Sequence, residues 1–94
     1  MSLKQHLFAQ LAQVSKSLGH ANRLMILDVL TQADCDVETL HHKLGLSVAN
    51  VSKHLQNLKQ AGLVKNHREG QRIIYSLSDS SVYQLILSLR TVAE

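Results

Sequence analysis

The stretch from Asp36 to Leu77 constrains the fold of this chain more than any other part. It contains two short segments with helical apolar spacing on either side of Gly45, followed by two β-prone runs on either side of Gly70. Two helices joined by a short glycine turn are typical of a helix-turn-helix, and a tight glycine turn between β-prone runs is typical of a hairpin. The sequence therefore predicts a helix-turn-helix at about 37–61 and a hairpin at about 63–77.

The second helix of this pair is expected over about Val48–Ala61. Ser47 suits its N-cap because the hydroxyl can accept a backbone N–H of the first turn, and Gly62 can take the left-handed backbone of a C-terminal cap. One side is apolar, with Val48, Val51, Leu55 and Leu58. The other side carries amides that can pair with adenine in the major groove, and it consists of Ala49, Asn50, Lys53, Gln56, Asn57 and Gln60. Periodicity alone leaves open an ordinary helical hairpin in a core.

The hairpin favours the helix-turn-helix interpretation. Basic and amide side chains gather near its tip, at Lys65, His67, Arg68, Gln71 and Arg72. In the second run, Ile73, Tyr75 and Leu77 are predicted to share one face. A basic hairpin directly after a recognition-type helix is a wing, and DNA phosphates are its natural contact.

The charge of the chain is unevenly distributed. The 94 residues carry a formal net charge of +3. Between Lys43 and Arg72 there are six lysines and arginines and one acid, so that this segment is positive while the remainder is negative. Such a distribution is expected of a nucleic-acid-binding surface, although a solvated basic face is also common on small domains.

Three further helices are predicted, at about 3–18, 21–31 and 80–93. The sequence therefore predicts one mainly α domain over residues 1–94, with five helices and a small two-stranded β-hairpin. Both terminal helices carry apolar stripes. So short a chain has little core to cover, and we therefore expect a homodimer that pairs through the N- and C-terminal helices. Such a dimer would place two recognition helices about 34 Å apart, matching successive major grooves of a palindromic site. The alternative is that both helices cover their own core.

Several classes of protein are disfavoured. No apolar run approaches the roughly 18 residues needed to cross a bilayer, and Lys4, Gln5 and His6 interrupt any signal-peptide core. A single cysteine excludes an intrachain disulfide and fits a reducing cytoplasm. No phosphate loop, nucleophile elbow or cleft-forming acid pair points to catalysis. We therefore expect a cytoplasmic protein that is not an enzyme and has no membrane partner and no cofactor.

Three segments resemble the ArsR/SmtB winged-helix repressors. They are LGHANRLMILDVL at Leu18–Leu30, the helix-turn-helix VETLHHKLGLSVANVSKHLQNLKQAGLV at Val37–Val64, and the wing REGQRIIYSLSD at Arg68–Asp79. The resemblance implies a dimeric bacterial repressor that leaves its DNA operator when an effector arrives. The segment GLSVANVSKHLQ is also similar to members of this family that carry, or are encoded beside, a sulfurtransferase domain.

The metal sites known in this family are not expected here. Its metal sensors often have Cys-x-Cys where this chain has Asp36 and Glu38. Other members place an Asp-x-His pair and a further His on the last helix, where this chain keeps Asp79 but has Ser81 and Val92 in place of the histidines. The resemblance therefore implies no metal ligand in this chain.

Two other groups are candidates for an effector site. Cys35 is the one thiol, and a thiol or reactive-sulfur sensor acting through it is one alternative function. A buried apolar role beside the helix cap at Asp36 also accounts for this cysteine. Glu38 and His42, with His41 adjacent, have a spacing that can bind zinc, but a solvated helix face is the more common explanation of such a pair. The effector is not identified by the sequence.

The sequence as a whole predicts a sequence-specific DNA-binding transcriptional regulator, a repressor released from a palindromic operator by an unidentified effector. A winged-helix module that binds an acidic protein is the alternative from another class. The proposed DNA-facing residues are Asn50, Lys53 and Asn57 for base edges with His54 flanking and Ala49 beside them, Ser47 and Ser52 for phosphates, and Arg68, Gln71 and Arg72 on the wing. Protonation of His54 and His67 is expected to strengthen phosphate contact.

Overall fold

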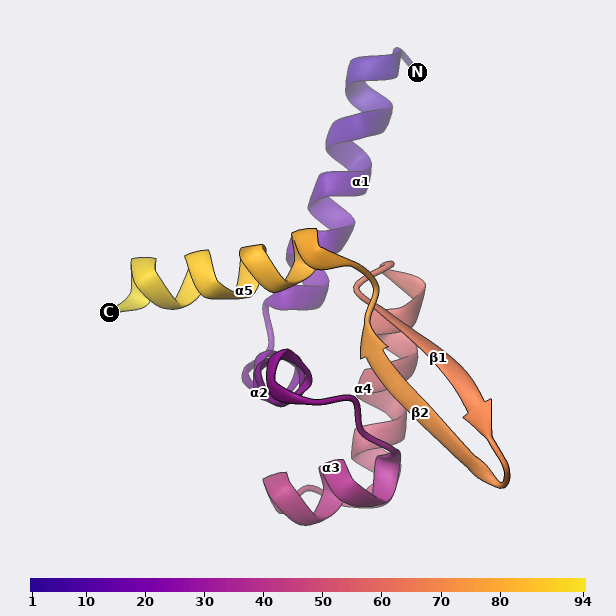
Figure 1. Ribbon diagram of the computed structural model, residues 1–94. Helices are drawn as coiled ribbons and strands as arrows, with labels where there is room; N and C mark the ends of the chain where they lie inside the picture. Colours follow the sequence, from indigo (N-terminus) through magenta and orange to yellow (C-terminus); the bar gives the residue numbers. More distant parts are fainter.

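The computed structural model describes residues 1–94 and consists of five α-helices and one two-stranded antiparallel sheet. In chain order the elements are α1 (Leu3–Leu18), α2 (Ala21–Gln32), α3 (Val37–Leu44), α4 (Val48–Gln60), β1 (Val64–Glu69), β2 (Arg72–Leu77) and α5 (Ser80–Ala93) (Figure 1). The predicted helix-turn-helix, wing and terminal helices are all confirmed. The observed ends of the elements differ from the predicted ends by a single residue at most.

Local signals set the ends of the helix-turn-helix. The Asp36 carboxylate accepts the Thr39 N–H at 2.8 Å, and the Ser47 hydroxyl accepts the Asn50 N–H at 3.1 Å. Each bond satisfies a backbone donor that the first helical turn leaves free, so α3 and α4 both begin at capped turns. Gly45 ends α3 with a φ of 68°, a left-handed conformation that glycine adopts at low cost.

The hairpin turn is as tight as the sequence predicted. Glu69 pairs with Arg72 at the ends of the two strands, which leaves Gly70 and Gln71 as a two-residue turn. Gly70 supplies the positive φ, 63°, that such turns require. Leu63 belongs to the turn after α4 rather than to β1.

Strand β2 is covered on both faces, and Ile73, Tyr75 and Leu77 share one of them, as the sequence predicted. Ile74 and Ser76 are buried on one face, whereas Ile73, Tyr75 and Leu77 are half-buried on the other. The reason is that helices α2, α3 and α5 all contact this strand.

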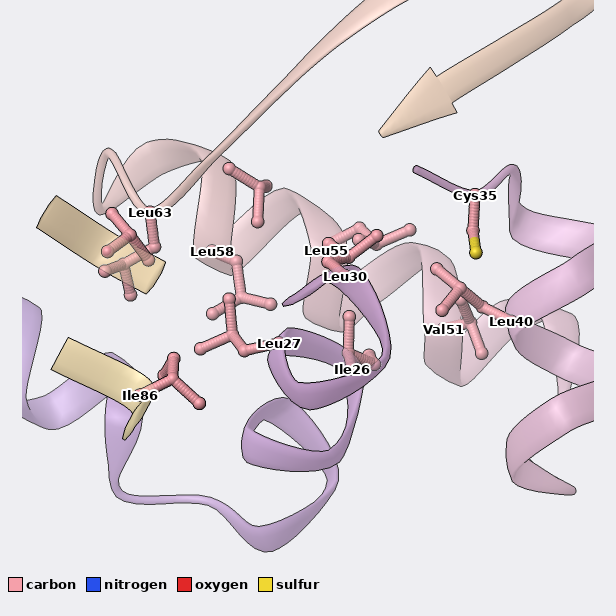
Figure 2. Packing of buried hydrophobic residues seen from close by; sticks show 12 residues of the cluster. Ile26, Leu27, Leu30, Cys35, Leu40, Val51, Leu55, Leu58, Leu63 and Ile86 are labelled. Carbon is pink, nitrogen blue, oxygen red and sulfur yellow. The ribbon is translucent and has the colours of Figure 1, made fainter. Parts of the chain in front are cut away.

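The hydrophobic core surrounds α2 (Figure 2). Ile26 and Leu27 of this helix are fully buried, and every other element contributes to the same cluster or packs against it directly. The cluster consists of Ile26, Leu27, Leu30, Cys35, Leu40, Val51, Leu55, Leu58, Leu63, Val64, Val82 and Ile86. Residues Val14 and Leu18 at the end of α1 pack against it while remaining partly exposed.

Helix α4 is attached to this core along one side only. Val51, Leu55 and Leu58 are each 0% exposed, as the apolar spacing predicted. Val48 was predicted to share that side, but it is 44% exposed. It is the first residue of the helix and lies ahead of the turns that face the core.

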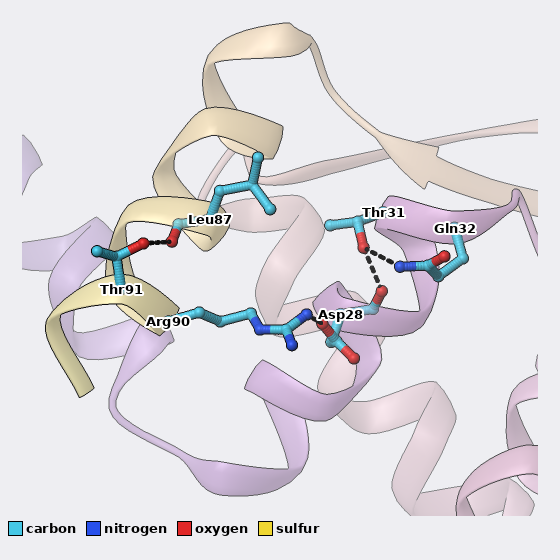
Figure 3. A network of polar contacts seen from close by, with 6 residues as sticks. All are labelled: Asp28, Thr31, Gln32, Leu87, Arg90 and Thr91. Atoms are coloured by element: carbon cyan, nitrogen blue, oxygen red, sulfur yellow. Dashed lines mark hydrogen bonds and ion pairs between the residues drawn. The ribbon is translucent and has the colours of Figure 1, made fainter. Parts of the chain in front are cut away.

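Helix α5 lies against α2 and is joined to it by an ion pair. Arg90 Nη1 is 3.1 Å from Asp28 Oδ1 (Figure 3). Both side chains are about half exposed, so the pair contributes about 1 kcal/mol at most. Beside it lies an apolar groove of about 540 Å³, lined by Leu24, Met25, Asp28, Val29, Leu44, Ile86, Leu89, Arg90 and Ala93.

Helix α1 projects away from the rest of the molecule (Figure 1). Every residue from Met1 to Gln13 is exposed, and only the last turns of this helix reach the core. No helix has both the length and the apolar character that crossing a bilayer requires.

Candidate nucleic-acid interface

The outer face of α4 presents free polar groups to the solvent. Ser47, Ala49, Asn50 and Lys53 are exposed, and Ser52 is half-buried. No hydrogen bond or ion pair engages the side-chain amide of Asn50 or the Lys53 ammonium group. The helix contains no acidic residue that would repel a phosphate. This face therefore has the chemistry that base edges and phosphates in a major groove require.

Asn57 lies on the same helix but is partly committed to the protein. Its Oδ1 atom accepts a hydrogen bond from the Ser17 hydroxyl at 2.6 Å. A bidentate pair with adenine needs both the oxygen and the amide nitrogen of an asparagine. In this arrangement only the nitrogen of Asn57 is free to donate.

His54, which the sequence predicted to flank the base contacts, is engaged by the protein itself. Its side chain is 8% exposed, and its Nδ1 atom accepts a hydrogen bond from Arg23 Nε at 3.3 Å. Burial lowers the pKa of His54, and the positive charges of His20, Arg23 and Lys53 lower it further. Protonation of His54 is therefore disfavoured in the folded protein.

The contact between His54 and Arg23 joins α4 to α2, two helices that are distant in the sequence. Helical spacing places His54 between the buried and the exposed side of α4, and 31 residues separate it from Arg23. The only signal in the sequence was a cation at the start of a mostly apolar helix. Ser17, which is buried at the end of α1, was missed for the same reason.

A polar hollow of about 550 Å³ continues the outer face of α4 toward the start of α2. No apolar residue lines it, and its two full cations, Arg23 and Lys53, face no acid within it. The lining consists of His20, Asn22, Arg23, Asn50, Lys53, His54, Gln56, Asn57 and Gln60. The residues at the start of α2 thus extend the predicted DNA-facing surface.

The wing carries two exposed polar side chains at its tip and one arginine that is already paired. Arg68 and Gln71 are exposed, and Arg68 makes only a long contact, 3.5 Å, with the Gly70 carbonyl. Arg72 donates from Nε to Asp36 Oδ2 at 2.8 Å. Part of the Arg72 guanidinium group therefore holds the wing to the start of α3, while its side chain stays 60% exposed and its phosphate contact stays a prediction.

The Asp36 carboxylate serves both the helix cap and this wing contact. Hydrogen bonds from Thr39, followed by the bond from Arg72, lower the pKa of Asp36 to about 2. Each of these donors prefers the ionised form of the carboxylate. Asp36 therefore stays charged at any pH at which the protein is expected to work.

Cys35 has a structural role that accounts for its burial. It is 3% exposed and belongs to the core cluster together with Leu40. Its backbone forms an isolated antiparallel bridge with Tyr75, in which the two N–H···O distances are 3.0 and 2.8 Å. Burial raises the pKa of the Cys35 thiol. A buried thiol with a raised pKa is a poor nucleophile.

Three potential metal ligands lie together on α3. The side-chain ligand atoms of Glu38, His41 and His42 are within 4.8 Å of one another. His42 Nε2 is 3.1 Å from Glu38 Oε1, and His41 Nδ1 is 2.5 Å from the Leu46 carbonyl oxygen. The contact between Glu38 and His42 is the one that residues four apart on an exposed helix commonly make. A polar outer face of α3 explains the cluster.

Comparison with known proteins gives a family and two relatives. The family model for the bacterial regulatory protein, arsR family, matches residues 20–66. The HTH-type transcriptional regulator Rv0324 of Mycobacterium tuberculosis is 37% identical over 91 residues, which cover 97% of this chain and 40% of Rv0324. The HTH-type transcriptional regulator YgaV of Escherichia coli K12 is 33% identical over 84 residues, which cover 88% of this chain and 85% of YgaV. The chain thus spans less than half the length of Rv0324.

A solved structure has the same fold over nearly the whole chain. It is the solution NMR structure of the homodimeric winged helix-turn-helix DNA-binding domain of Mb0332 from Mycobacterium bovis, a possible ArsR-family transcriptional regulator. Its TM-score is 0.93 at 36% sequence identity, and the match covers 99% of this chain and 86% of that chain. The winged helix-turn-helix architecture is thereby confirmed. The chain belongs to the ArsR family of bacterial regulatory proteins.

Proposed function

We propose that this chain binds a palindromic DNA operator as a homodimer and represses transcription from it. Helix α4 enters the major groove, where Asn50 and Lys53 contact base edges and phosphates, and the wing contacts the neighbouring backbone through Arg68 and Gln71. The observation that carries the proposal is the asymmetry of α4. Its back is held by three fully buried side chains, while its outer face is polar, lacks acids and has free donors.

The dimer is proposed from apolar surface that the single chain leaves uncovered. On α1, the exposed fractions of Leu3, Leu7, Phe8 and Leu11 are 92, 52, 57 and 47%. On α5, Tyr83, Leu87, Leu89 and Val92 are exposed as well. Contiguous exposed apolar surface of this kind marks an interaction site. A two-fold partner that covers both helices would set two copies of α4 about 34 Å apart.

The proposed activity involves binding without catalysis. Both relatives named above are transcriptional regulators, and no step of the proposal requires a bond to be made or broken. The protein would act in the bacterial cytoplasm, where it meets chromosomal DNA. An effector that releases the operator is part of the proposal, and its chemical class is left undefined.

The test is an assay in which DNA duplexes compete for binding to the purified protein. A fluorescent duplex from the region upstream of its own gene is bound, and unlabelled copies of that duplex or of random duplexes compete for the protein. The proposal predicts that the upstream duplex competes at least tenfold better, and that two chains bind each palindrome. Equal competition by all duplexes would contradict it and would favour a basic surface for an acidic protein partner.

A further inference from the structure

We infer that Arg23 and His54 are positioning residues for DNA binding. The hydrogen bond from Arg23 to neutral His54 fixes the orientation of α4, and protonation of His54 breaks that bond, so that DNA affinity falls on acidification. The inference rests on the proposed DNA-binding function and adds a device that regulates the same surface.

Two polar contacts join α4 to the junction of α1 and α2, and a third contact lies within that junction. Arg23 Nε donates to His54 Nδ1 at 3.3 Å, and Arg23 Nη1 donates to the Ser17 carbonyl oxygen at 3.3 Å. The Ser17 hydroxyl in turn donates to Asn57 Oδ1 at 2.6 Å. Ser17 and His54 are buried, and Arg23, His54 and Asn57 line the polar hollow. These contacts hold α4 at His54 and at Asn57, which lie about one helical turn apart.

These contacts set an orientation that the apolar core does not fix. Van der Waals contact between aliphatic side chains is non-directional, whereas hydrogen bonds to imidazole and amide groups require defined angles. A helix that reads base edges must hold its side chains within a fraction of an ångström of the productive geometry. The link from Arg23 to His54 is therefore suited to control how α4 presents Lys53 and Asn50.

The chemistry of the contact makes it sensitive to protons. An arginine has donors and no acceptor, so His54 must offer a lone pair at Nδ1 and carry its hydrogen on Nε2. A second proton would occupy Nδ1 and face the guanidinium group donor to donor. The other groups around His54 do not compensate, because the His20 ring, whose centroid lies 4.6 Å from that of His54, and the Lys53 ammonium both disfavour a positive charge on His54. No acid takes part in the network.

The direction of the effect distinguishes it from general electrostatics. Protonation of surface histidines raises affinity for a polyanion, so simple electrostatics predicts tighter DNA binding at lower pH. Burial and the nearby positive charges lower the pKa of His54 below its ordinary 6.5. The ordered arrangement is therefore fully present above pH 6.5, and it is lost as the pH falls through the lowered pKa. His54 thus contributes a loss of affinity at low pH.

The experiment compares the pH dependence of DNA affinity in matched variants. Fluorescence anisotropy with one duplex at constant ionic strength is measured from pH 8 to pH 5 for wild type, His54→Asn and His67→Gln. Asparagine offers Arg23 a neutral acceptor close to the position of Nδ1, and it does not titrate. His67 is an exposed wing histidine paired with Glu69, so it serves as the surface-histidine control.

The expected result is a loss of affinity at low pH that depends on position 54. Wild type and His67→Gln should lose affinity relative to His54→Asn by a factor on the order of ten at the acid end, the scale of one hydrogen bond to a charged group. The affinity of each protein is compared with its own affinity at pH 8. Parallel profiles for wild type and His54→Asn would overturn the inference.

A second measurement covers the case in which His54→Asn fails to fold. NMR titration of the His54 ring in wild type and in Arg23→Gln follows the contact without DNA. The inference predicts a higher midpoint in Arg23→Gln, because a neutral donor replaces the guanidinium charge, and an unchanged midpoint would overturn it. Absence of DNA binding by wild type at pH 8 would instead count against the proposed function, and the NMR result would still stand.

Discussion

Replacing Leu55 with alanine separates the two sides of α4. Leu55 is 0% exposed and belongs to the same core cluster as Leu30 of α2 (Figure 2). Truncation of a fully buried leucine costs its transfer free energy and leaves a cavity, which together lower the free energy of unfolding by about 2–5 kcal/mol. For a domain of this size, each kcal/mol lowers the melting temperature by roughly 4–8 °C. The base preference of the folded fraction should stay unchanged, because Leu55 does not reach the outer face.

Urea unfolding followed by circular dichroism measures this loss, and Val48→Ala is the matched control. Val48 belongs to the same helix but is 44% exposed, so its truncation should cost less than about 1 kcal/mol. Competition between upstream and random duplexes, at protein concentrations corrected for the folded fraction, measures base preference. Equal destabilisation by the two variants, or a changed preference in Leu55→Ala, would refute the assignment of a buried back and a free outer face.

Three further predictions concern the wing, the cap and the dimer. Arg68→Ala should weaken binding to all duplexes equally and reduce the salt slope of affinity by about one. Arg72→Ala should reduce that slope less, because Asp36 already neutralises part of the Arg72 charge. Equal slopes for the two variants would contradict a role of the ion pair between Arg72 and Asp36. Because the pKa of Asp36 is lowered from 3.8 to about 2, its contribution to stability is present above pH 3.8 and is lost as the pH falls toward 2. Asp36→Asn should therefore unfold with a weaker acid dependence than wild type in urea melts over that range. Leu7→Glu should yield monomers in sedimentation equilibrium, and a persistent dimer would argue against pairing through α1.

Local sequence signals predicted most of the fold. Capping residues such as Ser47 and glycines such as Gly45 act on their immediate neighbours, so the ends of the helices followed from the sequence within one residue. The spacing of Val51, Leu55 and Leu58 predicted which side of α4 is buried. These features depend on interactions within a few turns of one helix, and they do not need knowledge of the rest of the chain.

The candidate site was predictable only where it faces the solvent. Asn50 and Lys53 are exposed as expected, because nothing else in the fold approaches them. His54 and Arg72 behave differently because their partners, Arg23 and Asp36, are distant in the sequence and come close only through packing of α2 and the hairpin. Side-chain pairs of this kind are not encoded in periodicity. The contact of Asn57 with Ser17 was missed for the same reason.

The most direct test of the central claim is base discrimination by an Asn50→Ala variant, with Gln84→Ala on the exposed side of α5 as the control. Affinities for the upstream duplex and for duplexes changed at single adenines are measured side by side. If the outer face of α4 reads the operator, Asn50→Ala should lose about 1–3 kcal/mol of discrimination at one position of each half-site, while Gln84→Ala keeps it. Discrimination that is the same in Asn50→Ala, Gln84→Ala and wild type would contradict the account.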